Sequence, residues 1–226
     1  MIAATVLPMG ERALLLEVAD SACVLAVHHA LRERLDHRNH EDSAATFACV
    51  IDLVPAARTV LLHTRPDADL AQLGRAAVEL AASLPEPRDL ADVSGTDQEC
   101  VEIPVTYDGD DLADVAEATG MSEDEVIEAH LASTWRVAFF GFAPGFAYLS
   151  GGDPRLQVAR RSEPRTSVAA GSVGLAGEFS AIYPRSSPGG WQLIGRTDAA
   201  MWDESADPPS LLQPGALVRF VKTNPV

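Results

Sequence analysis

The first 84 residues alternate short apolar runs with two longer stretches of helical periodicity. Four runs have the composition of β-strands, namely IAATVLPMG, RALLLEVA, TFACVIDLVP and RTVLLHT. Apolar positions recur at helical spacing over residues 21–35 and 67–84, and Asp67 is the predicted N-cap of the second helix. Helices that alternate with pairs of short strands predict a small α+β sandwich of the ferredoxin-like type over residues 1–84.

Residues 85–99 have the proline, glycine and acid content of a linker between two domains. The second domain, residues 100–226, begins with a strand, VEIPVTY, and continues with two predicted helices. The first of these helices ends at Gly120, and the second begins at Ser122, which forms a predicted capping box with Glu125.

From Thr134 onward the pattern consists of short β runs separated by turns: TWRVAFF, SVGLAGEF, AIYP, GWQLIGRT and ALVRFV. Ten of the sixteen glycines lie between Gly141 and Gly195, where they can form tight corners between strands. Short strands with glycine corners predict a closed β-barrel or a sandwich instead of an open sheet. The predicted fold class is therefore α+β, with a barrel in the second domain.

The formal charge of −16 argues against nucleic acid or an anionic membrane as a partner. The charge is unevenly distributed, since residues 136–196 contain seven arginines and only three acids. This basic segment predicts either a site for a phosphate or carboxylate, or arginines that pair with acids elsewhere in the fold. The sequence shows no membrane-spanning run, signal peptide or paired-cysteine pattern, so we expect a cytoplasmic protein with reduced cysteines.

Lys222 is the single lysine of the sequence. A Walker A loop, a Ser-Ser-Lys amidase triad and a biotinyl-lysine each require a lysine within a motif, so we expect any such chemistry to depend on a partner chain. The run HRNHED, residues 37–42, contains two histidines and two acids. Because it lies in a polar connection between a helix and a strand, no metal site is predicted there.

The segment FFGFAPGFAYLSGG is rich in aromatic residues and glycine and carries no charge. Such a segment predicts either a piece of hydrophobic core or one apolar wall of a ligand site. In the second interpretation, Phe142, Phe146 and Tyr148 form the wall beside the turn at Pro144 and Gly145, and the wall excludes water.

Two further glycine-rich loops, AAGSVGLAG and SSPGGW, predict either tight barrel turns or backbone N–H groups that approach an anion. The residues concerned are Gly171, Ser172, Gly174, Ser187, Gly189 and Gly190. His130 ends the acidic helix that precedes the first barrel strand. It is a candidate acid, base or hydrogen-bond donor, and the alternative is a histidine that stabilises the end of the helix.

Four stretches, GFAPGFAYL, EPRTSVAAGSVGLAG, IYPRSSPGGWQLIGRT and LLQPGALVRF, in this order, resemble the allophanate hydrolase subunit 1 family. That family includes the B subunit of 5-oxoprolinase and KipI-like inhibitors of a sensor histidine kinase. The resemblance covers nearly the whole chain, although Ala159, Ala169 and Ser180 differ from the family's usual residues. It implies a ferredoxin-like N-terminal domain and a cyclophilin-like β-barrel.

The resemblance also implies an activity and partners. A family member of the 5-oxoprolinase type is expected to use ATP, with Mg²⁺ at a shared site, to phosphorylate the lactam oxygen of 5-oxoproline. The site is shared with a homologue of allophanate hydrolase subunit 2, the C subunit of 5-oxoprolinase. The A subunit, of the LamB/YcsF type, then helps to open the ring to glutamate. Two alternatives remain: a carboxyltransferase half of the urea carboxylase type, and a KipI-like kinase inhibitor.

Within such a shared site, His130, Arg165 and Ser172 are the expected catalytic residues. His130 would polarise the lactam or move a proton. Arg196 and the two glycine-rich loops would contact the nucleotide phosphates or the substrate carboxylate, because the guanidinium fork matches both groups.

Overall fold

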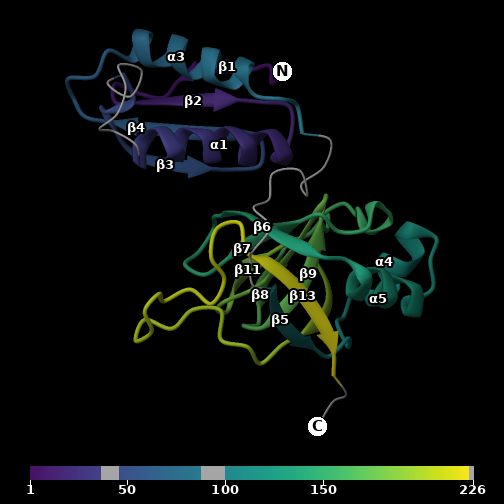
Figure 1. Cartoon of the computed structure of the whole chain (residues 1–226). Coiled ribbons are helices and arrows are strands. Elements are labelled where there is room, and N and C mark those ends of the chain that lie inside the picture. Colours follow the sequence, from purple (N-terminus) through teal and green to yellow (C-terminus); the bar gives the residue numbers. More distant parts are fainter. Residues whose placement is uncertain (37–45, 88–99, 224–226) are drawn as a thin grey trace. The chain divides into compact units, whose positions relative to one another are not determined.

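The chain forms two compact units, Met1–Gly95 and Thr96–Val226 (Figure 1). The computed structural model describes residues 1–36, 46–87 and 100–223, so most of the predicted linker, residues 85–99, lies outside the described part. Each unit has its own buried apolar core. Within the described residues, no helix has both the length and the apolar character needed to cross a membrane.

The N-terminal unit is a four-stranded antiparallel sheet covered by two helices, with all elements contributing to one core. Its strands are β1 (Thr5–Pro8), β2 (Ala13–Glu17), β3 (Val50–Pro55) and β4 (Thr59–Thr64), in the spatial order β1-β2-β4-β3. Its helices are α1 (Ser21–Asp36) and α3 (Leu70–Ser83). Alternate strand residues such as Leu14, Leu16 and Leu62 face the helices, as the period of two along a strand requires.

The order of elements in this unit differs from that of the ferredoxin-like fold. Elements β2, α1 and β3 form a split βαβ unit, because β4 lies between β2 and β3. The strands and helices named above, however, follow the order ββαββα, whereas the ferredoxin-like fold is defined by βαββαβ. The structure therefore establishes a mixed α/β unit, and the ferredoxin-like assignment stays a prediction.

Helix α3 begins two residues later than the sequence predicts. Asp69 has extended backbone angles, and its carboxylate accepts a hydrogen bond from the backbone N–H of Gln72 at 2.9 Å. The predicted N-cap at Asp67 is therefore wrong, because the cap is the residue whose side chain satisfies a free N–H of the first turn.

The C-terminal unit is a nearly closed barrel with a small additional two-stranded sheet. Its main sheet has seven strands in the order β12-β9-β10-β7-β6-β13-β5, and β11 pairs with β8. Thr106 and Arg196 exchange two backbone hydrogen bonds of 2.9 and 2.8 Å, which join the end of β5 to β12 at the opposite edge. The predicted closed barrel is confirmed at this level, and its cyclophilin-like character stays a prediction.

The strands are β5 (Cys100–Val105), β6 (Trp135–Phe140), β7 (Ala147–Ser150), β8 (Arg165–Val168), β9 (Ser172–Ala176), β10 (Phe179–Ile182), β11 (Ser187–Gly189), β12 (Gln192–Arg196) and β13 (Leu217–Lys222). A short 3₁₀ helix, η2 (Pro154–Leu156), follows β7.

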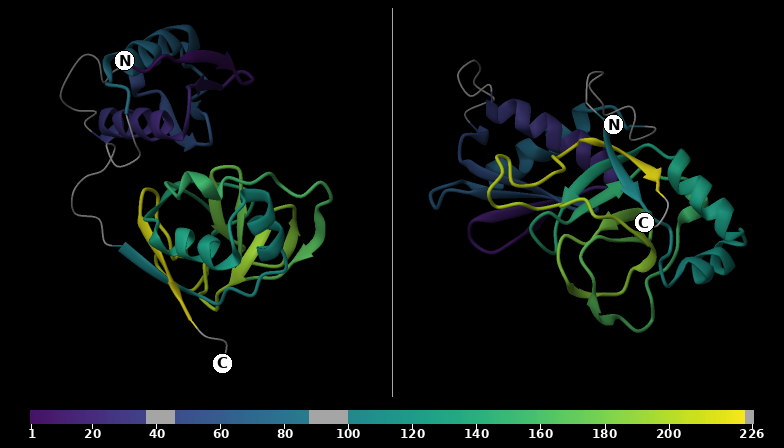
Figure 2. Two further views of the ribbon diagram at one scale, coloured as in Figure 1. Left: turned by 90° about the vertical axis from the view of Figure 1, so that its right-hand side faces the viewer. Right: turned by 90° about the horizontal axis from the view of Figure 1, so that it is seen from below.

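The helices α4 (Leu112–Thr119) and α5 (Glu123–Ala132) lie on the outside of the barrel in every view (Figures 1 and 2). Gly120 ends α4 in a left-handed conformation, with φ of 69°. Ser122 and Glu125 form the predicted capping box of α5. The end of α4 and the start of α5 are therefore as predicted, and the acidic side chains within the two helices face solvent.

Candidate functional site

The aromatic segment contributes both to a buried apolar cluster of the C-terminal unit and to its surface. Phe146 is 1% exposed, and its ring lies 5.2 Å from that of Tyr183 and 5.6 Å from that of Trp191. Phe142, four residues earlier, is 60% exposed. Tyr148 is half-buried and stacks on Phe139 at 4.3 Å. Phe146 is therefore a core residue, and Phe142 is the most exposed of the three aromatic residues of the predicted wall.

The loop that carries Phe142 has a tightly determined shape. Phe142 has a positive φ of 66°, which a bulky residue adopts only at a cost in backbone strain. Gly145 also has a positive φ, of 76°, and a Cβ there would lie 2.9 Å from the Cβ of Trp202. The backbone N–H of Phe146 donates to the carbonyl of Ala143 at 3.0 Å, which closes the turn next to Pro144.

Tyr183 connects the aromatic cluster to both glycine-rich loops. Its N–H donates to the carbonyl of Ser172 at 2.9 Å, and its carbonyl accepts from the N–H of Gly171 at 2.8 Å. A Cβ on Gly189 would clash with its hydroxyl oxygen, so only glycine fits there. Burial raises the pKa of Tyr183, which keeps the phenol protonated. The sequence prediction missed this residue, although it lies within the stretch IYPRSSPGGWQLIGRT.

The glycine-rich loops make contacts within the barrel. A Cβ on Gly171 would clash with the carbonyl oxygen of Thr197, whose N–H donates back to Gly171. Gly174 lies inside β9 and faces Ala181 on β10 in the register. Ser187 donates its hydroxyl hydrogen to the carbonyl of Arg185 at 2.9 Å. Gly190 accepts from the N–H of Arg161. These are the contacts of tight barrel turns, and anion binding by the loops stays a prediction.

Arg165 is held by a buried carboxylate that the sequence prediction did not identify. Asp111 is 1% exposed and accepts two hydrogen bonds from Arg165, at 2.9 and 2.8 Å. It also accepts from Arg161 and, at 2.7 Å, from the N–H of Leu193. Burial opposes the ionisation of Asp111, but the hydrogen bonds from Arg165 and Leu193 outweigh it and lower its pKa. This carboxylate therefore ties the loop before α4 to β8 and β12.

Several arginines of the basic segment pair with carboxylates, the alternative that the sequence left open. Arg196 is exposed and lies 2.9 Å from Asp108, and Arg155 pairs with Asp153. Arg160 lies over the ring of Trp191, 6.0 Å from its centroid. Arg160 and Arg185 take part in none of the ion pairs within the described ranges, which are His29–Glu33, Arg58–Glu17, Arg155–Asp153, Arg161–Asp111, Arg161–Asp114, Arg165–Asp110, Arg165–Asp111, Arg196–Asp108 and Arg219–Glu102.

His130 lies in the interior of the C-terminal unit. It is fully buried, with Nδ1 2.8 Å from the hydroxyl of Tyr107 and Nε2 3.0 Å from the hydroxyl of Ser180. Its ring stacks on Phe220 at 4.3 Å. Burial lowers the pKa of His130 to about 3, so the imidazole is neutral at physiological pH. No part of the ring reaches solvent, which does not fit direct contact with a ligand, and a catalytic role stays a prediction.

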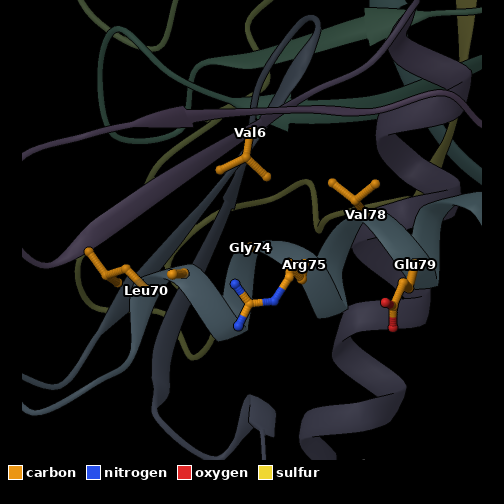
Figure 3. A pocket seen from close by; sticks show the side chains of 7 residues that line it. Val6, Leu70, Gly74, Arg75, Val78 and Glu79 are labelled. Atoms are coloured by element: carbon orange, nitrogen blue, oxygen red, sulfur yellow. The ribbon is translucent and has the colours of Figure 1, made fainter.

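A groove of about 410 Å³ lies in the N-terminal unit between β1 and α3 (Figure 3). Its lining residues are Val6, Leu70, Ala71, Gly74, Arg75, Val78 and Glu79. None of these is a predicted site residue. Among residues 1–36, 46–87 and 100–223, no three His, Cys, Asp or Glu side chains are placed to hold a metal ion. The HRNHED run lies outside those ranges.

The sequence matches a known family and named relatives. The family described as carboxyltransferase domain, subdomain C and D, matches residues 4–212. The B subunit of Bacillus subtilis 5-oxoprolinase is 44% identical over 137 residues, which cover 59% of this chain and 57% of that protein. The B subunit of Escherichia coli 5-oxoprolinase is 49% identical over 124 residues, covering 54% and 57%. The matched region thus spans little more than half the length of these curated relatives.

Solved structures share the fold. The TTHA0988 crystal structure has a TM-score of 0.70 and 33% identity, and covers 95% of this chain but 40% of that one. The conserved uncharacterized protein PH0987 from Pyrococcus horikoshii has a TM-score of 0.55 and 34% identity, and the match covers 97% of this chain and 98% of that one.

A more distant sequence relative is the urea amidolyase of Saccharomyces cerevisiae. It is 32% identical over 118 residues, which cover 47% of this chain and 6% of that protein.

Proposed function

Because this chain belongs to the family of the carboxyltransferase domain, subdomain C and D, we propose that it is the B subunit of an ATP-dependent 5-oxoprolinase. The observation that carries this proposal is the name shared by its relatives from Bacillus subtilis and Escherichia coli, both B subunits of 5-oxoprolinase. The active site is shared with a homologue of allophanate hydrolase subunit 2, called the subunit 2 homologue below. A LamB/YcsF-type subunit completes ring opening to glutamate. When bound, ATP supplies the phosphoryl group that activates the lactam oxygen.

The residues of this chain contribute cations and rigidity to such a site. Arg160 and Arg185 are exposed and have no carboxylate partner among the described residues, which fits contact with an anionic phosphate or carboxylate. Arg165 is oriented by the buried Asp111, so its guanidinium is held in place before a ligand arrives. We assign no residue of this chain to Mg²⁺.

His130 acts at most through its neighbours in this scheme. Both ring nitrogens are occupied by the hydroxyls of Tyr107 and Ser180, and no part of the ring reaches solvent. A proton that leaves His130 must therefore pass through one of these hydroxyls. Tyr107 is the half-buried member of the three and offers the route to the surface.

Co-expression of the chain with its subunit 2 homologue tests the proposal. ATP hydrolysis is measured with 5-oxoproline, with urea and without substrate, for each chain alone and for the complex. We expect 5-oxoproline-dependent turnover from the complex and none from this chain alone. Appreciable turnover by this chain alone would contradict the shared site.

A second candidate function is a carboxyltransferase half of the urea carboxylase type. The family description and the likeness to yeast urea amidolyase favour it. The same assay separates the two functions, because this candidate requires urea-dependent, bicarbonate-dependent ATP turnover with a biotin-carrying partner. A complex that responds to urea and ignores 5-oxoproline would replace the first proposal with the second.

A further inference from the structure

Adjoining segments of the C-terminal unit carry most of its exposed large apolar side chains. Among the described residues of this unit, the exposed large apolar side chains are Phe142, Trp202, Leu211 and Val221. The first three are carried by adjoining segments. Trp202 lies against the backbone of Gly145 in the Phe142 loop, and the N–H of Leu211 donates to the carbonyl of Met201 at 3.1 Å. We call Phe142, Trp202 and Leu211 the aromatic patch.

Phe142 is presented to solvent at a cost to the fold. Its φ of 66° is the single positive value at a non-glycine residue in the described ranges. A glycine would adopt this angle without strain, and a Phe residue that stays 60% exposed gains only partial burial, against the rings of Phe146 and Tyr183. Strain that folding does not require is typical of residues held for binding. A hydrogen bond from the N–H of Phe146 to the carbonyl of Ala143 closes the turn of this loop, which reduces the conformational freedom that a partner would have to remove.

The segment that carries Trp202 is uniformly acidic. From Asp198 to Ser210 it contains four acids and no base. Asp198, Asp203, Glu204 and Asp207 are all exposed. Interfaces of stable complexes place aromatic side chains at the centre and polar or charged groups at the rim. The complementary surface is therefore an apolar pocket with lysines or arginines around it.

We propose that the aromatic patch is the docking surface for the subunit 2 homologue, which receives Phe142 in an apolar pocket with a basic rim. This inference rests on the proposed function for the identity of the partner. It is supported by the TTHA0988 structure, in which the region equivalent to this chain is 40% of a longer polypeptide and so occurs together with further protein. The acidic rim accelerates association, and the aromatic residues slow dissociation.

The test measures binding of the purified subunit 2 homologue to Phe142→Gly, Phe142→Ala and Val221→Ala by titration calorimetry, without substrate. We expect both Phe142 variants to bind about 30-fold more weakly, equivalent to about 2 kcal/mol. Val221→Ala is the matched control, because Val221 is exposed in the same unit but lies on β13. It should bind like the wild type.

Thermal denaturation of the same variants separates binding from folding. Phe142→Gly should melt at a higher temperature than Phe142→Ala, because glycine removes the strain that alanine keeps. If Phe142 were needed only for stability, the affinity of each variant for the subunit 2 homologue would fall in proportion to the decrease in its Tm. The double variant Asp198→Asn, Glu204→Gln should slow association at low salt and reduce its salt dependence, while dissociation stays unchanged.

Three outcomes would overturn the inference. If Phe142→Gly binds the subunit 2 homologue as tightly as the wild type does, the interface lies elsewhere. If the wild-type chain self-associates and Phe142→Gly makes it a monomer, the aromatic patch binds a second copy of this chain instead of the subunit 2 homologue. Affinity that stays unchanged as salt is raised well beyond the physiological range contradicts the basic rim. A wild-type complex that forms through Phe142 but shows no 5-oxoproline-dependent turnover leaves the surface intact and refutes the proposed function alone.

Discussion

Buried polar side chains are rare in the described part of the N-terminal unit and frequent in that of the C-terminal unit. The first buries Ser21 and Thr64, whereas the second buries Asp111, His130, Arg136, Ser150, Ser172, Ser180 and Thr197. A buried polar group costs free energy unless it is hydrogen-bonded, and a buried charge costs more. The N-terminal unit is therefore held by apolar packing, whereas the C-terminal unit retains polar contacts that fix the positions of particular side chains.

Both units are held by contacts between distant segments, but these contacts differ in kind. In the N-terminal unit, α3 packs through apolar side chains on β1 and β2, which lie at the other end of the unit's sequence. In the C-terminal unit, Asp111 holds Arg165 across 54 positions, and His130 meets Ser180 across 50. A group of chemical interest is thus assembled from distant segments in the second unit alone, among the residues the structure describes.

The largest effect is expected where a buried charge loses its partner. Asp111→Asn leaves Arg161 and Arg165 without their carboxylate, and we expect it to destabilise the C-terminal unit by about 3 kcal/mol. All three tryptophans of the sequence lie in this unit, so urea denaturation followed by tryptophan fluorescence reports on it selectively.

Asp108→Asn is the matched control for that variant. Asp108 lies in the same loop and pairs with Arg196, but both side chains are largely exposed, at 42% and 64%. Its loss should cost less than about 1 kcal/mol. Equal effects of the two substitutions would mean that the buried carboxylate adds nothing beyond a surface pair.

A smaller effect is expected from acidification. His130 is neutral in the folded state because burial lowers its pKa to about 3, whereas the unfolded chain takes up a proton near pH 6.5. The unfolded state therefore binds more protons below pH 6.5, and stability falls as the pH drops towards 3. One group accounts for up to about 1.4 kcal/mol per pH unit, so about 1 to 2 kcal/mol is lost between pH 6.5 and about 5.

Urea denaturation of the C-terminal unit at several pH values measures this loss through tryptophan fluorescence. His130→Gln removes the titrating group, so its stability should vary less over that pH range than the stability of the wild type. His28→Gln is the control in the other unit, where burial lowers the pKa of His28 to about 4. It should leave the tryptophan signal unchanged. An identical pH profile for His130→Gln and wild type would show that the buried ring does not titrate in this way.

Local patterns predicted local structure well. The capping box of Ser122 and Glu125 and the left-handed Gly120 were readable because each depends on residues within one turn of a helix. Strands β7, β8 and β11 were missed as separate elements because each is short and lies within a segment rich in glycine, proline or serine.

The chemistry of the site was harder to predict than the fold. The sequence identified Arg165 but not Asp111, because nothing local distinguishes this carboxylate from the other acids of its helical pair. It identified His130 as a candidate but did not reveal its burial, because its contacts with Tyr107 and Ser180 are made by the folded barrel. Burial depends on such long-range packing, and a single sequence does not reveal which distant residues are in contact.

The smallest predicted effect tests the corrected start of α3 in the N-terminal unit. Asp69→Ala removes the carboxylate that accepts from the N–H of Gln72 and should destabilise this unit by about 1 kcal/mol. Asp67→Ala, two residues earlier, should change stability by less than about 0.5 kcal/mol, because its side chain does not cap the helix. Hydrogen exchange of the α3 amides measures both, and the tryptophan signal of the C-terminal unit should not respond to either. If Asp67→Ala proves the more damaging of the two, the helix begins where the sequence alone had placed it.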